Sequence, residues 1–443
     1  MQQRIAIILA GCAVGLCALP SAWGQVTAGD ISFVTSYQNG TGGVTEMADV
    51  FAVAISPDGR HVYTAGGVHV AAFDRDAGDG SLTWIQGLTD GVGGIDGINN
   101  SDHPIALSPD GNYLYVPSIN DDSIAIFNRD TATGLLSQVG MVTDQVGGVV
   151  GIDSPAAVQI SADGQYLYAS ADGSVAVFDR DIATGQLNWN NSIFAPNLAR
   201  LFNLNLSPDG QSAFAAARDG DFVTVFDRHA VSGQLTQIQI LTGPYDGPIY
   251  AKATPDGQFV YVSSQIGDSI SVFSRDPVTR QLAFIADYPD NVDGFNHFNH
   301  VWDEVFVPMT DLMLATAVHE DALTVMTRDD TTGLLTFEQV FRDGINGVTG
   351  MDGPRSIVIS PDRKHIYVTA PHQSTLAVYA LPGIGDVNKD GAVDIADLAL
   401  VGGHWDGAGS TGFAGGVLVP VVGSWVGGVI AGVVLTARRQ RRS

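Results

Sequence analysis

Short segments in which hydrophobic and polar residues alternate fill most of the chain, and residues 105–136 show the pattern most clearly. The residues on both sides of Ser108-Pro109-Asp110-Gly111 alternate with the period of two that is typical of strands. The turn itself is favoured because Pro fixes φ and Asp-Gly tolerates a positive φ. A polar loop then leads into the strand Ile124–Phe127, and Asn128-Arg129-Asp130 turns the chain into a fourth strand. We therefore expect one small sheet of four antiparallel strands, which uses about fifty residues.

This unit is repeated along the chain. The first turn recurs at matched positions, namely Ser56–Gly59, Ser161–Gly164, Ser207–Gly210, Thr254–Gly257, Ser360–Arg363 and, in degraded form, Pro308–Asp311. The second turn recurs as Phe73–Asp76, Phe178–Asp181, Phe226–His229, Phe273–Asp276 and Met326–Asp329. A period of about 45–55 residues with four strands per unit is typical of β-propellers. The sequence predicts an all-β, seven-bladed β-propeller over residues 25–382, in which the Arg and Asp of the second turn pair with each other or hold the turn.

The two ends of the repeat array complement each other. Residues Ile31–Tyr37 resemble the last strand of a blade, whereas the final repeat, Pro354–Leu381, supplies only three strands. Pairing the two would remove edges that otherwise stay open. We therefore predict that the N-terminal strand closes the ring as the outer strand of the last blade.

The first 24 residues have the features of a secretory signal. One positive charge precedes the apolar run Ile5–Leu19, and cleavage is expected after Gly24. Leu9-Ala10-Gly11-Cys12 resembles a lipoprotein cleavage box, which is the alternative processing site. Both cysteines, Cys12 and Cys17, lie within this signal, so ordinary cleavage leaves no cysteine and no disulfide.

The C-terminal end is predicted to anchor the protein. Residues 413–437 contain no charged residue, and about 20 apolar residues suffice to cross a bilayer. The arginine-rich residues 438–443 mark the cytoplasmic side, which places the propeller outside the cytoplasm. The arrangement resembles the C-terminal sorting tails of bacterial surface proteins. Residues 407–412 are interpreted as a linker.

The charge of the chain limits its partners. Without Arg4 and the four tail arginines, 16 basic and 47 acidic residues remain, a net charge of −31. This excess argues against nucleic acid and anionic lipid as ligands of the propeller, which leaves a small molecule or a surface partner.

Candidate chemistry lies in the loops that join the second strand to the third and each blade to the next, because these loops share one face around the central channel. We call this the channel face. The channel-face loops differ in sequence from blade to blade, unlike the repeated turns of the opposite face. They carry His297, His300 and His319, which form a possible metal-binding cluster without fixed spacing.

The repeats, SPDG followed by FxRDxxTGxL, resemble those of the lactonase family of seven-bladed propellers, which includes proteins like 6-phosphogluconolactonase and carboxymuconate cyclase. The resemblance covers residues 30–382 and implies an Arg, a His and an acidic residue at the channel. The matching positions are Arg355, His103, His319 and Glu320. Glu320 or His319 would act as general acid or base, and Arg355 or Arg218 would stabilise an oxyanion. Two functions stay open: a lactone hydrolase or cycloisomerase, and a non-catalytic surface module that binds a ligand or partner.

Residues 383–406 carry a calcium-loop pattern and the start of a short helix. Oxygen ligands recur at the loop positions that Ca²⁺ requires, with Gly391 at the sharp turn: Asp386, Asn388, Asp390, Ala392 through its carbonyl, Asp394 and Asp397. The segment resembles one half of a dockerin repeat, and dockerins usually carry two such loops. A Ca²⁺-stabilised spacer between propeller and anchor is therefore an equal alternative to cohesin binding.

Overall fold

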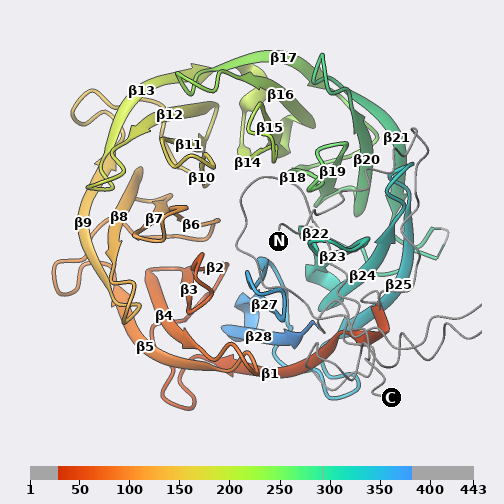
Figure 1. Cartoon of the computed structure of the whole chain (residues 1–443), viewed down its shortest axis with the longest axis horizontal. Helices are drawn as coiled ribbons and strands as arrows, with labels where there is room; N and C mark the ends of the chain where they lie inside the picture. The colour runs from red at the N-terminus through yellow and green to blue at the C-terminus, as the bar shows by residue number, and fades with distance from the viewer. Residues whose placement is uncertain (1–27, 293, 382–443) are drawn as a thin grey trace, which may run out of the picture.

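The computed structural model describes residues 28–292 and 294–381 as a ring of seven sheets around a central channel (Figure 1). Each sheet has four strands, and every pairing between neighbouring strands is antiparallel. This confirms the predicted seven-bladed β-propeller. The predicted signal, calcium loop, linker, membrane segment and basic tail lie outside the described residues. Among residues 28–292 and 294–381, no helix is both long and apolar enough to cross a bilayer.

The blades follow one another along the chain, each running from its inner strand to its outer strand. Blade 1 consists of β2 (Ala52–Ile55), β3 (His61–Gly66), β4 (His69–Arg75) and β5 (Leu82–Thr89). Blade 2 consists of β6 (Ala106–Leu107), β7 (Tyr113–Ser118), β8 (Ser123–Arg129) and β9 (Leu136–Thr143). Blade 3 consists of β10 (Ala157–Ile160), β11 (Tyr166–Ala171), β12 (Ser174–Arg180) and β13 (Leu187–Phe194). Blade 4 consists of β14 (Leu201–Leu206), β15 (Ser212–Ala217), β16 (Phe222–Arg228) and β17 (Leu235–Leu241).

Blades 5 to 7 complete the ring. Blade 5 consists of β18 (Pro248–Ala253), β19 (Phe259–Ser264), β20 (Ser269–Arg275) and β21 (Leu282–Pro289). Blade 6 consists of β22 (Val301–Phe306), β23 (Leu312–Ala317), β24 (Ala322–Arg328) and β25 (Leu335–Arg342). Blade 7 consists of β26 (Ile357–Ile359), β27 (His365–Ala370), β28 (Thr375–Ala380) and the N-terminal β1 (Ser32–Gln38). Single 3₁₀ turns occupy some of the connections: η1 (Ala28–Asp30), η2 (Pro196–Leu198), η3 (Arg218–Gly220), η4 (Val318–Glu320) and η5 (Pro371–Gln373).

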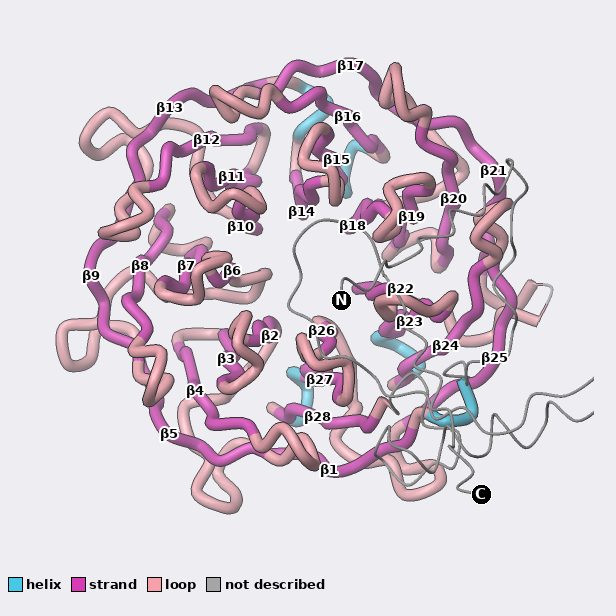
Figure 2. Tube along the Cα trace, viewed as in Figure 1, coloured by secondary structure: helices cyan, strands magenta, loops and turns pink. Residues whose placement is uncertain are grey.

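The ring closes through the N-terminal strand, as predicted. β1 pairs with β28 from Ser32 opposite Ala380 to Gln38 opposite Thr375. The ring of Phe33 packs against Tyr379, with 5.5 Å between ring centroids. The first and last strands of the array therefore belong to one sheet (Figure 2). Blade 7 is thus built from two segments that lie at opposite ends of the repeat array.

Every outer pairing carries a register shift. In blades 1 to 6 the shift falls just before the last three residues of the third strand, for example between Ile126 and Phe127, and in blade 7 it falls between Phe33 and Thr35. Such bulges twist an edge strand and make it a poorer template for pairing with another chain. The exposed outer strands are protected in this way.

The core lies between blades and is built from their alternating inward residues. Between blades 2 and 3, Tyr115, Ile126, Leu167 and Phe178 are fully buried in one cluster. Equivalent clusters fill the other interfaces. Because each sheet packs on the next, burial of these faces holds the ring together without disulfides.

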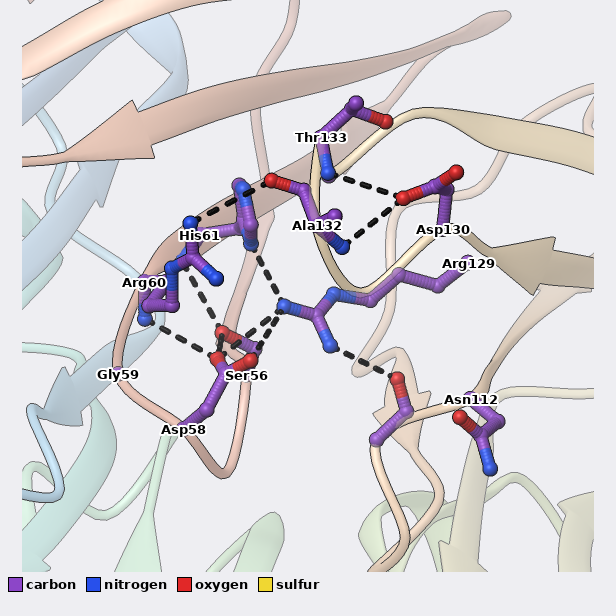
Figure 3. A network of polar contacts seen from close by, with 12 residues as sticks. Ser56, Asp58, Gly59, Arg60, His61, Asn112, Arg129, Asp130, Ala132 and Thr133 are labelled. Carbon is purple, nitrogen blue, oxygen red and sulfur yellow. Dashed lines mark hydrogen bonds and ion pairs between the residues drawn. The ribbon is translucent and has the colours of Figure 1, made fainter.

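A polar clamp ties neighbouring blades on the face opposite the channel face (Figure 3). Arg129 of blade 2 reaches into blade 1, where Nη2 donates to Asp58 Oδ2 at 3.0 Å and Nε donates to the Tyr63 hydroxyl at 2.8 Å. Nη1 donates to the Gly111 carbonyl of its own blade at 2.9 Å. Burial favours the neutral acid, but hydrogen bonds from Ser56, the Arg60 amide and Arg129 lower the pKa of Asp58 to about 2. The clamp therefore joins a buried guanidinium to a carboxylate that stays ionised.

The clamp recurs with variations at six interfaces, through Arg75, Arg129, Arg180, Arg228, Arg275 and Arg328. These arginines bind groups of the preceding blade, and Arg328 also pairs with Asp330 of its own turn at 2.5 Å. The predicted alternative, in which the Arg pairs with the Asp that directly follows it, is not observed at these interfaces. That Asp holds the turn alone: Asp130 accepts the amides of Ala132 and Thr133. The repeated motif is therefore structural in both of its charged residues.

Candidate functional site

The inner strands of all seven blades line a cavity of about 160 Å³ in the channel. Its lining is polar on blades 3 to 6, through Gln159, Asn203, Asn205, Tyr250, Lys252 and Asp303, and mainly apolar on blades 7, 1 and 2. Lys252 Nζ donates to the Asp303 carboxylate and, at 2.8 Å, to the Glu304 carbonyl. Asp303 also accepts the Ile357 amide at 3.2 Å. This ion pair links blades 5, 6 and 7 inside the channel.

Arg355 lies at the channel face, in the loop that leads into β26. Its guanidinium carbon is 3.8 Å from the Trp302 ring centroid and 4.7 Å from that of Phe51. The backbone is fixed on both sides, because its amide donates to the Thr369 carbonyl at 2.8 Å and its carbonyl accepts the Thr316 hydroxyl at 2.6 Å. Arg355 Nε is buried without a hydrogen-bond partner. Burial lowers the pKa of Arg355 to about 10, so the guanidinium remains charged at neutral pH.

Arg355 forms no ion pair within residues 28–292 and 294–381. The carboxylate that most favours its charge is Asp102, which accepts the Gly67 amide at 2.8 Å. Burial raises the pKa of Asp102, and Arg355 opposes that shift. A half-buried cation framed by aromatic rings, with no carboxylate bound to it, is suited to an anionic ligand.

His103 lies beside this group. Its ring meets Phe202 edge-on at 4.8 Å between centroids, and Phe202 meets Trp302 in the same way at 5.3 Å. The Nδ1 atom of His103 is buried and has no partner. Burial, and then the charge of Arg355, lower the pKa of His103 to about 4. His103 is therefore a neutral imidazole at pH 7.

His319 reaches the same aromatic group through His300. The rings of His300 and His319 lie 4.2 Å apart between centroids, and His300 stacks on Trp302 at 6.0 Å. Burial, followed by repulsion from His319, Arg355 and Arg218, lowers the pKa of His300 to about 4. His319 Nδ1 lies 3.2 Å from the Asn299 side-chain oxygen.

Glu320 has other partners. Its carboxylate is 3.1 Å from Arg342 Nη2 and 3.5 Å from His297 Nδ1. Arg342 is the last residue of β25 and His297 lies in the connection before β22, and neither contact joins Glu320 to Arg355, His103 or His319. The structure therefore gathers Arg355, His103 and His319 around Trp302 and leaves Glu320 in a separate ion-pair network. Of the described residues, no three His, Cys, Asp or Glu side chains are arranged to hold a metal ion, and His297, His300 and His319 are no exception.

Sequence reasoning did not single out Phe51, Phe202, Tyr250 or the Lys252–Asp303 pair. Each of them stands in or next to an inner strand, at positions where the repeats differ. Phe51 and Phe202 stand at the same repeat position as Trp302, five residues before the first turn of the blade. Tyr250, Lys252 and Asp303 line the channel, where the lining residues of blades 1 and 2 are the apolar Val53, Pro104 and Ile105. Glu304, next to Asp303, is fully buried, and burial raises its pKa to about 7 while Ser263 donates to it at 2.6 Å.

Comparison with known proteins agrees with the fold. The sequence model of the family described as "Lactonase, 7-bladed beta-propeller" matches residues 51–146, 142–244 and 251–348. Among curated proteins, none matches this chain in sequence.

Three solved structures illustrate the range of similar folds. The periplasmic gluconolactonase of Pseudomonas aeruginosa is 21% identical over 72% of this chain and 88% of its own, with a TM-score of 0.56. A Bacteroides uniformis protein proposed to be a 6-phosphogluconolactonase is 19% identical over 69% of this chain and 88% of its own, with a TM-score of 0.55. A chain of the hydrazine synthase of Kuenenia stuttgartiensis is 19% identical over 77% of this chain and 98% of its own, with a TM-score of 0.57. At these identities the likeness establishes the fold alone.

Proposed function

Because the chain belongs to the lactonase family of seven-bladed β-propellers, we propose that its channel face binds a small anionic lactone or sugar-derived acid. The observation that carries the proposal is Arg355, whose guanidinium is held against Trp302 and has no ion-pair partner among the described residues. A buried donor without a partner costs free energy, which a ligand carboxylate or phosphate would recover. The charge of Arg218 lowers the pKa of Arg355, so the positive potential of Arg218 reaches the same place.

Lactone hydrolysis is the second candidate, and the neutral imidazoles favour it. A water molecule would attack the lactone carbonyl while His103 or His300 takes its proton, and Arg355 would stabilise the oxyanion that develops on the carbonyl oxygen. The ring C–O bond would then break as the imidazolium returns its proton to the leaving ring oxygen, which gives a hydroxy acid. Glu320 has no place in this scheme because its carboxylate is bound to Arg342 and His297.

Replacement of Arg355 tests the proposal. Titration with gluconate, glucono-δ-lactone and their phosphorylated forms should give affinities about 10- to 100-fold weaker for Arg355→Met than for the wild type, since a charge-assisted hydrogen bond contributes about 1.5–3 kcal/mol. Arg60→Met, an exposed arginine on the opposite face, is the matched control and should bind like the wild type. Equal affinities for Arg355→Met and the wild type would refute the site. Release of hydroxy acid from the lactones separates hydrolysis from binding alone.

We also propose that the propeller acts outside the cytoplasm, attached to the membrane by residues 413–437. The apolar runs at both ends of the chain support this location. The name of the Pseudomonas aeruginosa relative, a periplasmic protein, is consistent with it. Protease added to intact or outer-membrane-permeabilised cells should digest the propeller, and protection of the propeller in both would contradict the proposal.

The calcium loop is a further part of the proposal. Titration of the whole chain with Ca²⁺ should show one site, and Asp390→Ala should abolish it because this residue supplies an oxygen ligand at a fixed loop position. Asp96→Ala, an exposed acid on the propeller, is the control and should leave the titration unchanged. A titration that survives Asp390→Ala would place the ion elsewhere. We expect the propeller to keep its unfolding temperature in chelator, since its closure uses β1 and not the ion.

A further inference from the structure

One position at each blade interface packs under the next blade. It is the first residue of the second strand, and in chain order it is His61, Tyr113, Tyr166, Ser212, Phe259, Leu312 and His365. A glycine with positive φ in the turn of the following blade makes room for the ring: Gly134 over His61, Gly185 over Tyr113, Gly80 over His365. A Cβ at any of these glycines would overlap the ring beneath it. The residue at this position is therefore clamped between two blades.

Histidine occupies this position in only two blades, and both contact the clamp arginine. His61 Nδ1 lies 2.6 Å from Arg129 Nη2, and His365 Nδ1 lies 2.7 Å from Arg75 Nη2. The two imidazoles are only 1% and 3% exposed. Because a guanidinium can only donate, each Nδ1 must accept, which requires a neutral ring with its proton on Nε2. A second proton would turn each hydrogen bond into a contact between two cations.

Charged groups around the two rings do not neutralise such a proton. The cations near His61 are Arg129 and Arg60, and the carboxylates are Asp58 and Asp74. Asp74 Oδ1 lies 3.8 Å from His61 Nε2, and the Asp74 side chain is largely exposed. His365 faces Arg75 and Lys364, with Asp362 and Asp79 opposing them. Asp58 and Asp362, the carboxylates that most favour a charged ring, are already bound to the clamp arginines. Burial and the adjacent arginine lower the pKa of His61, and they lower that of His365 to about 4.

The two histidines lie on the two sides of a single blade. His61 is at the interface between blades 1 and 2, and His365 is at the interface between blades 7 and 1, next to the strand pair that closes the ring. We propose that His61 and His365 form an acid-sensitive latch: their protonation releases blade 1 from both neighbours and loosens the ring beside its closure. This inference is independent of the ligand proposed for the channel face.

The direction of the pH effect follows from the neutral rings. In an opened or unfolded chain an imidazole takes up a proton as the pH falls below about 6.5, whereas in the latch the pKa of His61 is lowered and that of His365 is about 4. The stability supplied by the latch is therefore complete above pH 6.5 and declines as the pH falls from 6.5 towards 4. At pH 5 the opening equilibrium at His365 should be favoured about 20-fold over its value at pH 7.

Hydrogen exchange on the whole chain tests the latch. After correction for intrinsic rates, exchange at pH 5 relative to pH 7 should rise about 20-fold or more in β2–β5 and β26–β28, and not in blades 3 to 5. The double variant His61→Tyr/His365→Tyr should lose this rise. Tyrosine is the matched choice because Tyr113 and Tyr166 fill the same position in their blades. The Tyr113 hydroxyl donates to the Ala183 carbonyl at 2.6 Å, and the Tyr113 ring centroid is 5.3 Å from the guanidinium carbon of Arg180.

The reverse variant gives an independent readout. Tyr113→His should create acid-dependent exchange at the interface between blades 2 and 3, in β6–β13, without changing the behaviour of blade 1. His103 and His300 also have lowered pKa values, but they lie at the channel face and stay in place in all of these variants. If the double tyrosine variant keeps the acid-dependent exchange of blade 1, or if the acid effect spreads evenly over all seven blades, the proposal is wrong.

Discussion

Removal of residues 25–38 will abolish the cooperative unfolding of the propeller. The deletion takes away β1, so that β28 loses the strand to which six of its positions are paired. At about 1 kcal/mol for each hydrogen bond and about 1.5–3 kcal/mol for a buried side chain such as Ile31, the loss is comparable with the entire stability of a typical domain, about 5–15 kcal/mol. It also removes Tyr37, whose hydroxyl accepts the Leu82 amide of blade 1 at 2.7 Å.

Circular dichroism during heating and gel filtration measure this effect. We expect the deleted protein to show no sharp transition and to associate through the freed edge of β28. Removal of residues 25–29 alone is the control and should unfold like the mature chain. A synthetic peptide of residues 30–40 should restore a cooperative transition. A deleted protein that unfolds at the wild-type temperature would show that β1 is dispensable for closure.

Replacement of Arg129 by Met will destabilise the propeller by about 3–5 kcal/mol. The guanidinium is buried and satisfies Asp58, Tyr63, His61 and the Gly111 carbonyl at once, so its removal leaves several polar groups unpaired across an interface. Breaking one partner of a buried pair has an effect of this size because the other charge stays behind. Urea unfolding followed by tryptophan fluorescence is the measurement.

Two further variants define the effect of Arg129. Arg60→Met, exposed in the same region, should change stability by less than about 0.5 kcal/mol. Asp58→Asn combined with Arg129→Met should be less damaging than the sum of the single changes, because each single change leaves a partner unpaired. Additive losses would mean that Arg129 and Asp58 act separately.

The sequence was sufficient for the fold because the information is local and repeated. Each turn is specified by a few residues, and the strands between the turns alternate with a period of two. The strand that closes the ring was recognisable from the three-stranded last repeat. The partner of Arg129 could not be recognised from the sequence, because an identical Arg and an identical Asp occur in neighbouring repeats. No local pattern tells whether the two pair within a blade or between blades.

The candidate site was predictable only in part. Arg355 and His103 were placed on the channel face from their positions before inner strands, and His319 from the loop before β24. Their environment depends on Trp302, Phe202 and Phe51, which come from blades 6, 4 and 1 and meet only in the closed ring. Glu320 has the spacing expected of a channel residue, but its carboxylate binds Arg342, 22 positions further along the chain. Such a contact is set by side-chain direction, which sequence spacing does not report.

The place where the described chain ends has a mechanical consequence. The described residues end at Leu381, directly after β28, and β28 is hydrogen-bonded to β27 on one side and to β1 on the other. A tether that pulls along the axis of β28 would load both ladders in shear, so that many hydrogen bonds resist the force together. A strand leaving from the edge of a sheet would instead unzip one bond at a time. The closure by β1 thus gives β28 two neighbouring strands that share the load, where a three-stranded last blade would give it one.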